Sequence, residues 1–284
     1  HYMYKIVSKR ELNDTVIQME VEAPFVAKKA KPGQFIILRV NEEGERIPLT
    51  VAGCQGDNVK IIFQIVGSTT KLLNAKNVGD YLQDFVGPLG KPTELEGLKD
   101  VCIIGGGAGC AIALPVAEAL HKMGCNVTSI IGFRSNDLLI LEDEFKACSS
   151  ELIVTTDDGS YGVKANVTVP LKEMLTNGKH VDKVITMGPF IKMTFVVLAA
   201  KEFGVPCDVS MNPIMIDGTG MCGCCRLSLN VDGKRVTKFA CVDGPDFNGY
   251  EVDFDVTMHR TRMSSGFERH AYEETCNLLN KEVK

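Results

Sequence analysis

The sequence DVCIIGGGAG at residues 100–109 passes directly from a continuous apolar segment into a run of glycines. An uninterrupted apolar segment of this length is typical of a strand buried on both faces. The next stretch, residues 111–123, has a helical pattern, and apolar segments at 126–132, 152–156 and 183–187 predict further strands. Strands that alternate with helices predict a parallel, doubly wound sheet, so we expect an α/β domain in this part of the chain.

The glycines after the first strand form a candidate nucleotide site. A dinucleotide pyrophosphate needs backbone N–H groups at a helix N-terminus and no side chains in its way. The predicted turn offers such a position with Gly105, Gly106, Gly107 and Gly109. Cys110 occupies the last glycine of the usual G-x-G-x-x-G pattern, and no acidic residue ends the next strand. A tight strand-to-helix turn without a ligand therefore stays open as an alternative.

The part of the chain before residue 98 predicts a small antiparallel β-barrel. Its short segments mix β-branched residues with alternation of apolar and polar positions, and turn residues such as Pro32-Gly33 separate them. Regular short strands with such turns are typical of a barrel. Only residues 68–75 have a helical pattern. The expected strands include 15–22, 34–40, 46–52 and 59–66.

Length and composition are those of an ordinary folded protein. The chain has 284 residues, of which 45% are hydrophobic and 24% are charged, enough for two or three domains. A net charge of −5 without a long basic tract argues against nucleic-acid binding. No segment reaches the roughly 18 apolar residues of a membrane span, and no signal peptide opens the chain. We therefore expect a cytoplasmic protein without a membrane span.

Four of the 11 cysteines are concentrated near the end of the chain. In a cytosolic protein such a group indicates a metal site rather than disulfides. Cys222 and Cys225 form a C-x2-C pair, Cys241 follows beyond a predicted turn, and Asp217 stands five residues before Cys222. Asp217 thus takes the position of the first cysteine in the C-x4-C-x2-C spacing of plant-type [2Fe–2S] sites. The spacing predicts a [2Fe–2S] cluster with Asp217, Cys222, Cys225 and Cys241 as its ligands.

Two other interpretations of the cysteine segment stay open. A structural zinc ion could be held by the three cysteines together with Asp217. Cys224, which is adjacent to Cys225, could replace Asp217 as the fourth ligand, although neighbouring side chains tend to diverge. The remaining cysteines are expected to be mostly small buried hydrophobic residues: Cys54, Cys102, Cys110, Cys125, Cys148, Cys207 and Cys276.

These changes of pattern divide the chain into three predicted domains. The first is a barrel at residues 3–97, the second is a Rossmann-like domain at 98–208, and the third is a small cysteine-rich domain with a polar tail at 209–284. Two barrel segments are candidates for binding a phosphorylated cofactor. In Arg46-Ile47-Pro48-Leu49-Thr50 a guanidinium could neutralise a pyrophosphate and a hydroxyl could reach a ring nitrogen. The segment Val66-Gly67-Ser68-Thr69-Thr70 opens a predicted helix and offers a second phosphate position.

The order of these features resembles the ferredoxin–NADP reductase superfamily. In that superfamily an N-terminal barrel binds flavin through an R-x-P-L-[ST] strand, and a Rossmann-like domain binds nicotinamide. The flavin pattern is matched here by Arg46-Ile47-Pro48-Leu49-Thr50, and the turn Gly87-Pro88-Leu89-Gly90 is also similar. The resemblance implies that Gly188-Pro189 lies near the nicotinamide. Without the resemblance, a surface arginine and a simple strand-to-helix turn would be the alternatives.

Within the superfamily, the chain resembles one branch over nearly its whole length. That branch contains the electron-transfer subunit of dihydroorotate dehydrogenase and the small subunit of NADH-dependent reduced ferredoxin:NADP oxidoreductase, also called sulfide dehydrogenase. The segments 157–162 and 239–245 are similar to this branch. The dihydroorotate subunits usually have four cysteine ligands, so Asp217 resembles the second group more closely. The resemblance implies FAD, a [2Fe–2S] cluster and NAD(H), in preference to NADP(H), as cofactors.

The resemblance also implies an activity and partners. The chain would be an oxidoreductase subunit in a heterodimer with a larger flavin and iron–sulfur subunit, which reaches ferredoxin and couples the reactions by electron bifurcation. No side chain is expected to act as a catalytic acid or base. Arg134 and Asp158 are expected at the nucleotide site, where Arg134 could meet a 2′-phosphate or pair with Asp137 or Glu142. The alternatives are a dihydroorotate dehydrogenase subunit and, in a different class, a zinc-stabilised nucleotide-binding module.

Overall fold

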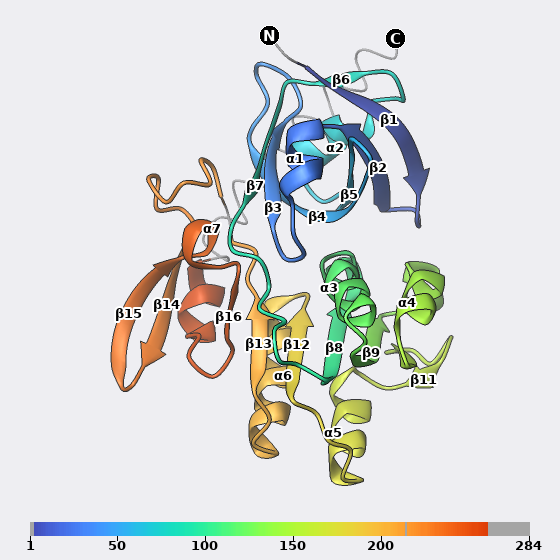
Figure 1. Ribbon diagram of the computed structural model, residues 1–284, viewed down its shortest axis with the longest axis vertical. Helices are drawn as coiled ribbons and strands as arrows, with labels where there is room; N and C mark the ends of the chain where they lie inside the picture. The colour runs from blue at the N-terminus through green and yellow to red at the C-terminus, as the bar shows by residue number, and fades with distance from the viewer. Residues whose placement is uncertain (1–2, 214, 261–284) are drawn as a thin grey trace.

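The computed structural model describes residues 3–213 and 215–260, which form three β-sheets. In Figure 1 a barrel coloured blue to teal lies above an α/β sheet coloured green to orange, and a two-stranded hairpin lies beside that sheet. The predicted fold class, an N-terminal antiparallel barrel followed by a Rossmann-like sheet, is therefore confirmed.

The first sheet is antiparallel and has the strand order β6-β1-β2-β5-β4-β3-β7. Side chains that point inward from alternate positions, such as Met19 and Val21, are completely buried and form the barrel interior. The barrel consists of β1 (Tyr4–Glu11), β2 (Val16–Glu22), β3 (Phe35–Arg39), β4 (Ile47–Gln55), β5 (Asn58–Gln64), β6 (Tyr81–Leu82), β7 (Asp84–Leu89) and the helices α1 (Pro24–Lys29) and α2 (Ser68–Asn74).

Helix α1 contradicts the expectation that only residues 68–75 of the barrel are helical. Pro24 begins this helix, at a position where the missing proline N–H is not needed. The helix has six residues and buries only Val26 among them. So short a segment shows no helical period in the sequence. A smaller difference concerns Arg46, which immediately precedes β4 rather than lying inside a strand.

The second sheet has the strand order β11-β10-β9-β8-β12-β13-β16, and all its pairs are parallel except β13 with β16. Its strands are β8 (Asp100–Gly106), β9 (Asn126–Phe133), β10 (Glu151–Thr156), β11 (Val163–Lys164), β12 (Lys183–Met187), β13 (Cys207–Ser210) and β16 (Asp246–Asn248). The helical segments are the 3-10 turns η1 (Gly107–Gly109) and η2 (Asn136–Leu138) and the helices α3 (Cys110–Lys122), α4 (Glu142–Cys148), α5 (Thr168–Thr176) and α6 (Phe190–Glu202).

Helices cover both faces of this sheet. Along β8, Val101 and Ile103 pack with α3 and α4, whereas Cys102 and Ile104 pack with α5 and α6. Because successive side chains of a strand point to opposite faces, a strand covered on both sides is apolar at every position. This packing explains the continuous apolar segment at the start of the domain.

The third sheet is the hairpin of β14 (Arg226–Val231) and β15 (Lys234–Phe239), followed by the short helix α7 (Ala240–Asp243). Its two-residue turn has positive φ at both Asp232 and Gly233. Asp-Gly is favoured there because this turn type needs two left-handed residues. The chain then returns to the second sheet as β16, so residues after 208 contribute both to the hairpin and to the second sheet.

The predicted domain boundaries at 97/98 and 208/209 remain a prediction, and residues 261–284 lie outside the described part of the chain. Cys276 lies there as well. Of the other scattered cysteines, Cys54 is exposed and Cys125 is half-buried, whereas Cys102, Cys110, Cys148 and Cys207 are buried. Among the described residues, no helix is long and apolar enough to cross a membrane.

Candidate functional site

The two predicted nucleotide-binding turns meet at the carboxyl edge of the second sheet. Strands β8 and β12 are neighbours, and Met187 pairs with Gly105 in their register. From β8 the chain continues to β9 on one side, and from β12 it continues to β13 on the other. Sheets of this kind bind ligands in the crevice at the point where the strand order reverses. The structure therefore brings Gly105–Gly109 and Gly188-Pro189 together at the expected place.

The glycines of these turns serve different purposes. A Cβ atom at Gly109 would lie 2.6 Å from the Gly188 Cα atom, and one at Gly188 would lie 3.1 Å from the Gly106 carbonyl oxygen. A Cβ atom at Gly105 would lie 2.9 Å from the Cys110 Sγ atom. These three glycines are therefore needed for the close packing of the two turns. This finding agrees with the alternative of a tight strand-to-helix turn without a ligand. Gly107 has φ +54° and open space where its Cβ would be, so a ligand can approach the backbone there.

A residue that sequence reasoning missed, Lys192, lies beside the same turn. It belongs to the first turn of α6, and its Cδ atom would lie 3.2 Å from a Cβ atom at Gly106. Burial raises the pKa of the Cys110 thiol to about 12, and the charge of Lys192 opposes this shift. The lysine ammonium group is thus close to the start of α3. Its only sequence signal is its position three residues after Pro189.

The flavin motif of the barrel faces this crevice. Pro48, Leu49 and Thr50 of β4 line a small hollow together with Ile112 of α3 and with residues at the end of β13, after it and just before β16. Thr50 pairs with Phe35 of β3, which lines the same hollow. The barrel motif therefore lies close to α3, the helix that follows the glycine turn. The remaining lining residues are Ser210, Met211, Asn212, Met215 and Pro245.

Arg46 immediately precedes β4 and is half exposed. Its Nη2 atom is 3.8 Å from Asp84 Oδ2, and the same oxygen accepts a hydrogen bond of 2.7 Å from Arg39 Nε. One carboxylate thus serves two guanidinium groups, and the distance to Arg46 is the longer one, so Arg46 is only weakly paired. A phosphate group fits beside it because guanidinium groups bind phosphate oxygens by charge-assisted hydrogen bonds.

The second phosphate candidate, at the start of α2, is partly satisfied within the chain. The Thr70 hydroxyl oxygen accepts hydrogen bonds of 3.0 Å from the N–H groups of Val66 and Gly67. Thr69 is buried, at 5% exposure. The N–H groups of Val66 and Gly67, two of the donors predicted for a phosphate, therefore already have a partner within the chain.

Gly87, another predicted site residue, also has a packing reason to be glycine, because a Cβ atom there would lie 2.6 Å from the Ile36 Cγ2 atom.

Arg134 and Asp158 lie close together where β9 and β10 end. The Asp158 N–H donates a hydrogen bond of 3.2 Å to the Arg134 carbonyl oxygen. Hydrogen bonds from Ser160, at 2.6 Å from the hydroxyl and 2.9 Å from the N–H, hold the pKa of Asp158 below its usual range. Arg134 is exposed and has no ion pair among the described residues. Its predicted alternative partner Glu142 pairs instead with Lys146 at 2.9 Å.

The four predicted cluster ligands form two close pairs. Asp217 Oδ1 lies 3.3 Å from Cys222 Sγ, and Cys225 Sγ lies 3.2 Å from Cys241 Sγ. Asp217 and Cys222 are five residues apart, as the first two ligands of the C-x4-C-x2-C spacing are. A two-iron cluster has two protein ligands on each iron, so two pairs of donors fit it.

The same pairing argues against a zinc ion. Tetrahedral zinc at about 2.3 Å from each sulfur draws its ligands within about 4 Å of one another. Within the described part of the chain, the one group of three or more possible metal ligands with all donor atoms within 4.8 Å of one another lies elsewhere, at Asp100, His180 and Asp182. The cysteine segment therefore fits a cluster of two irons better than a single metal ion.

Asp217 also organises the backbone of the cysteine loop. Its carboxylate accepts hydrogen bonds from the N–H groups of Thr219 at 3.1 Å, Met221 at 3.1 Å and Cys222 at 3.0 Å. Burial alone would raise the pKa of Asp217, but the hydrogen bonds from Thr219 and Cys222 hold it well below the usual range. Asp217 is thus ionised, as a metal ligand must be.

Cys224 lies beside the predicted ligands, and its thiol is close to that of Cys222. Burial, followed by the neighbouring Cys222, raises the pKa of its thiol. Burial also raises the pKa of the predicted ligand Cys241, to about 12, so the thiol pKa does not distinguish Cys224 from a ligand. The choice of Asp217 over Cys224 as the fourth ligand therefore remains a prediction.

The cysteine loop rests on the barrel. At Gly218, which has φ +73°, a Cβ atom would lie 2.7 Å from the Leu89 Cδ1 atom and 2.8 Å from the Ile37 Cδ1 atom. Cys225 and Cys241, each 1% exposed, belong to the same apolar cluster as Phe35 beside the hollow. Continuous packing therefore joins the proposed cluster site to the proposed flavin site.

A buried carboxyl group at the junction of these parts was also missed by sequence reasoning. Asp246 of β16 accepts a hydrogen bond of 2.5 Å from the Thr93 hydroxyl, on the connection between the two large sheets. Its Oδ1 atom is buried without a hydrogen-bond partner among the described residues. Burial raises the pKa of Asp246 to about 6, against the hydroxyls of Thr93 and Ser210. Its neighbour Pro245 lines the hollow.

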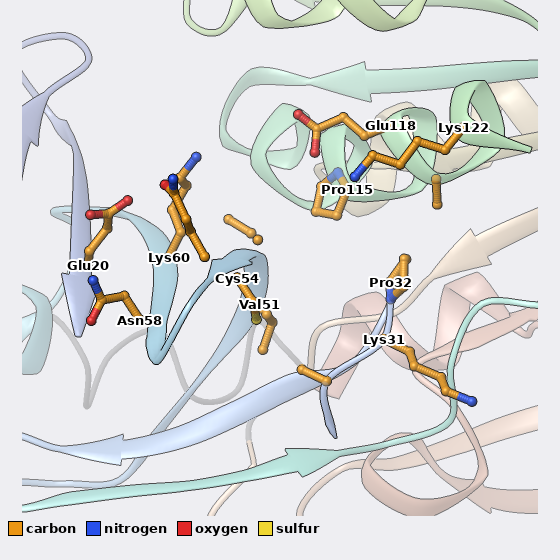
Figure 2. Close-up of a pocket in the computed structure, with 15 residues that line it drawn as sticks. Glu20, Lys31, Pro32, Val51, Cys54, Asn58, Lys60, Pro115, Glu118 and Lys122 are labelled. Atoms are coloured by element: carbon orange, nitrogen blue, oxygen red, sulfur yellow. The ribbon is translucent and has the colours of Figure 1, made fainter. Parts of the chain in front are cut away.

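Figure 2 shows a larger cleft, between the barrel and α3, that contains none of the predicted site residues. Lys60 from the barrel and Glu118 and Lys122 from α3 line it. Burial raises the pKa of Glu118, and the two lysines oppose this shift. Three lysines and two glutamates line the cleft, so charges of both signs are mixed there: Lys31, Lys60, Lys122, Glu20 and Glu118.

Comparisons with known proteins agree with this geometry. The family described as the iron-sulfur cluster binding domain of dihydroorotate dehydrogenase B matches residues 212–253. The chain is 45% identical over 271 residues to a Thermotoga maritima protein named dihydroorotate dehydrogenase B (NAD(+)), electron transfer subunit homolog, and the alignment covers 95% of this chain and 94% of the relative. It is 49% identical to an uncharacterized Clostridium beijerinckii protein, with 92% and 90% of the two chains covered.

A solved structure is similar over nearly the same length. It is a chain of the NADH-dependent reduced ferredoxin-NADP oxidoreductase, described for flavin-based electron bifurcation. The TM-score is 0.88 at 43% identity, and the superposition covers 96% of this chain and 98% of that chain. The similarity includes the barrel, the second sheet and the cysteine segment.

Proposed function

The chain belongs to the family of dihydroorotate dehydrogenase B electron-transfer subunits and their homologues, and on that basis we propose that it transfers electrons between NAD(H), FAD and a [2Fe–2S] cluster. A larger partner subunit receives or supplies the electrons. The donor pairs at the cysteine loop, the positive charge at Arg46 and the open turn at Gly107 each fit one of these cofactors.

The complex that we propose is an NADH-dependent reduced ferredoxin:NADP oxidoreductase. The observation that carries this choice is the match to 98% of a chain of that enzyme with a TM-score of 0.88. The partner is then a larger flavin and iron–sulfur subunit in a heterodimer, ferredoxin reacts through that subunit, and the complex works in the cytoplasm. The second candidate is the electron-transfer subunit of a dihydroorotate dehydrogenase, which is supported by the name of the Thermotoga maritima relative.

The residues of this chain bind and orient the cofactors. When bound, the flavin exchanges a hydride with the nicotinamide and single electrons with the cluster. Arg46 neutralises the flavin phosphates, and Pro48, Leu49 and Thr50 form one wall of the hollow beside α3. The turns at Gly107 and Gly188 hold the dinucleotide at the carboxyl edge of the second sheet. Ile112 of α3, the helix that follows the glycine turn, lines the hollow, so α3 connects the two proposed sites.

The cluster ligands complete the path toward the partner. Cys225 and Cys241 are buried against the apolar cluster that includes Phe35 and Met215, whereas Cys222 is exposed. One side of the cluster site therefore faces the hollow and the other faces the surface. This placement is suited to passing electrons from the flavin to a docked protein.

The test is a purification of the full chain with the subunit that co-purifies with it. We expect flavin and [2Fe–2S] absorption, and bleaching of both by NADH. A colourless protein that contains zinc would contradict the proposal. Reduction of the complex by dihydroorotate, with no reaction with reduced ferredoxin, would select the second candidate instead.

A further inference from the structure

Lys192 lies beside the glycine turn although it is not part of the glycine motif. It is the third residue of α6, and its aliphatic stem passes within 3.2 Å of the place where a Cβ atom at Gly106 would be. The side chain is half-buried. Its stem therefore covers the turn between β8 and α3, while its ammonium group lies near the start of α3.

The surroundings of this ammonium group lack a counterion. Among residues 3–213 and 215–260, no carboxylate lies within 4.0 Å of Lys192 Nζ. The first turns of both α3 and α6 contain no acidic residue. Lysine is rarely withdrawn from water without an anionic partner, and two helix N-termini add partial positive charge at the same place. Among the described residues, the ammonium group of Lys192 therefore has no carboxylate to neutralise it.

Two cations flank the glycine turn from opposite sides. Lys192 follows β12 and Arg134 follows β9, with β8 and its turn between them. A dinucleotide that lies across the sheet edge from Gly188 to β9 has its pyrophosphate over the turn after β8. Its adenosine ribose then lies on the side of Arg134. The pyrophosphate is thus the anion that Lys192 can reach.

We propose that Lys192 binds the pyrophosphate of the nicotinamide dinucleotide and thereby sets the affinity for NAD(H) and NADP(H) alike. This inference rests on the proposed function and deepens it. Lysine acts at such a site as a flexible point charge, so arginine retains part of the interaction and a neutral side chain loses it.

The experiment measures the dissociation constants of NAD⁺, NADP⁺ and ADP-ribose by calorimetry on the full chain that carries its flavin and cluster. Lys192→Met removes the charge and keeps an unbranched side chain, and Lys192→Arg restores a cation. Lys201→Met is the matched control, because Lys201 lies at the opposite end of α6 and is exposed. We expect Lys192→Met to weaken binding of all three ligands about 10- to 100-fold. Lys192→Arg should recover most of this loss, and Lys201→Met should change nothing.

Salt supplies a second measurement. If Lys192 pairs with phosphate, the loss of affinity between low and high ionic strength is smaller in Lys192→Met than in the unaltered protein. Unchanged constants in Lys192→Met would overturn the inference, and so would a loss for NAD⁺ with none for ADP-ribose, which would place the contact at the nicotinamide. Failure of the unaltered protein to bind any of the three ligands would instead contradict the proposed function.

Discussion

Asp217 is both a hydrogen-bond acceptor and a candidate metal ligand. Its carboxylate holds three backbone N–H groups of its own loop, and it faces Cys222 at 3.3 Å. Its Oδ2 atom also accepts a hydrogen bond from the Thr219 hydroxyl, whereas Oδ1 accepts only from the Thr219 N–H besides facing Cys222, so Oδ1 keeps a lone pair for iron. A spacing pattern cannot distinguish the two functions, since both require an acidic residue here.

Replacing Asp217 by cysteine separates the ligand role from the alternative that Cys224 binds the cluster. We expect Asp217→Cys to shift the electron paramagnetic resonance signal and the midpoint potential of the reduced cluster, because thiolate and carboxylate differ in their bonding to iron. Cys224→Ala should leave both nearly unchanged. Iron content measured in both variants controls for loss of the cluster. A shift in Cys224→Ala with none in Asp217→Cys would identify Cys224 as the ligand.

Asp246 makes stability depend on pH. Its folded pKa of about 6 lies above the ordinary value of 3.8, so folding favours the protonated carboxyl. The corresponding stabilisation is complete below pH 3.8 and is lost as the pH rises through about 6. An asparagine cannot ionise and keeps an acceptor for Thr93. Between pH 4 and pH 7, Asp246→Asn should therefore gain on the order of 2 kcal/mol relative to the unaltered protein.

The measurement is the thermal midpoint of both proteins across that pH range. The charged and titratable groups that face Asp246 are Lys183 and Asp208, which form an ion pair at 2.9 Å. The exposed Asp57 provides the control, since Asp57→Asn should give no such trend. Parallel pH profiles for Asp246→Asn and the unaltered protein would show that the buried carboxyl does not titrate in this range.

At the scale of elements, the sequence predicted those strands and turns whose cause is local. The strand at 183–187 has the predicted bounds, because Gly188 stops an apolar segment at once. The hairpin turn after Val231 follows from Asp-Gly. Helix α1 and strand β16 were not predicted, since they are short and depend on the surfaces against which they pack. Lys192 and Asp246 were also missed, because the residues that they contact are distant from them in the sequence.

The turn between β8 and α3 yields a prediction about the nucleotide. Gly107→Asn places a side chain in the open space above the turn, and asparagine tolerates its φ of +54° better than most residues. We expect NADH to reduce the flavin at least tenfold more slowly, because the side chain obstructs the pyrophosphate and one tenfold step corresponds to about 1.4 kcal/mol. The flavin and cluster spectra should stay intact. Stopped-flow absorbance measures the rate.

Gly124→Asn is the control for backbone strain in this experiment. Gly124 has φ +80° and open space at its Cβ position, but it follows the far end of α3. Equal rates in the two variants would mean that strain, and not obstruction of the nucleotide, explains the effect.

At the scale of the whole molecule, the contact between the cysteine loop and the barrel fixes the distance between the proposed cluster and flavin. Gly218→Ala places a methyl group 2.7 Å from the end of the Leu89 side chain and 2.8 Å from that of Ile37, so these side chains or the loop must shift at the contact. We expect electron transfer from flavin to cluster to slow by roughly tenfold or more, while NADH still reduces the flavin at the normal rate. Rapid-mixing spectroscopy that follows both chromophores distinguishes the two steps.

Gly233→Ala is the matched control for that variant. Gly233 has φ +77° in the hairpin turn and open space at its Cβ position, so it carries the same backbone strain without the contact. If Gly233→Ala slows electron transfer from flavin to cluster as much as Gly218→Ala does, the contact between the cysteine loop and the barrel does not determine the distance between the two cofactors.

The return of β16 to the second sheet has a consequence for how the polypeptide can be cut or recombined. The cysteine-rich segment between β13 and β16 is an insertion within the nucleotide-binding unit, since both flanking strands belong to one sheet. A stop codon after Ser210 would remove β16, the outer neighbour of β13, and leave the backbone hydrogen-bonding groups on that side of β13 as an open edge prone to aggregation. By contrast, protease cleavage in the β14–β15 turn would leave both fragments held together. Exchange of this module between homologues therefore requires two crossover points, one on each side of it.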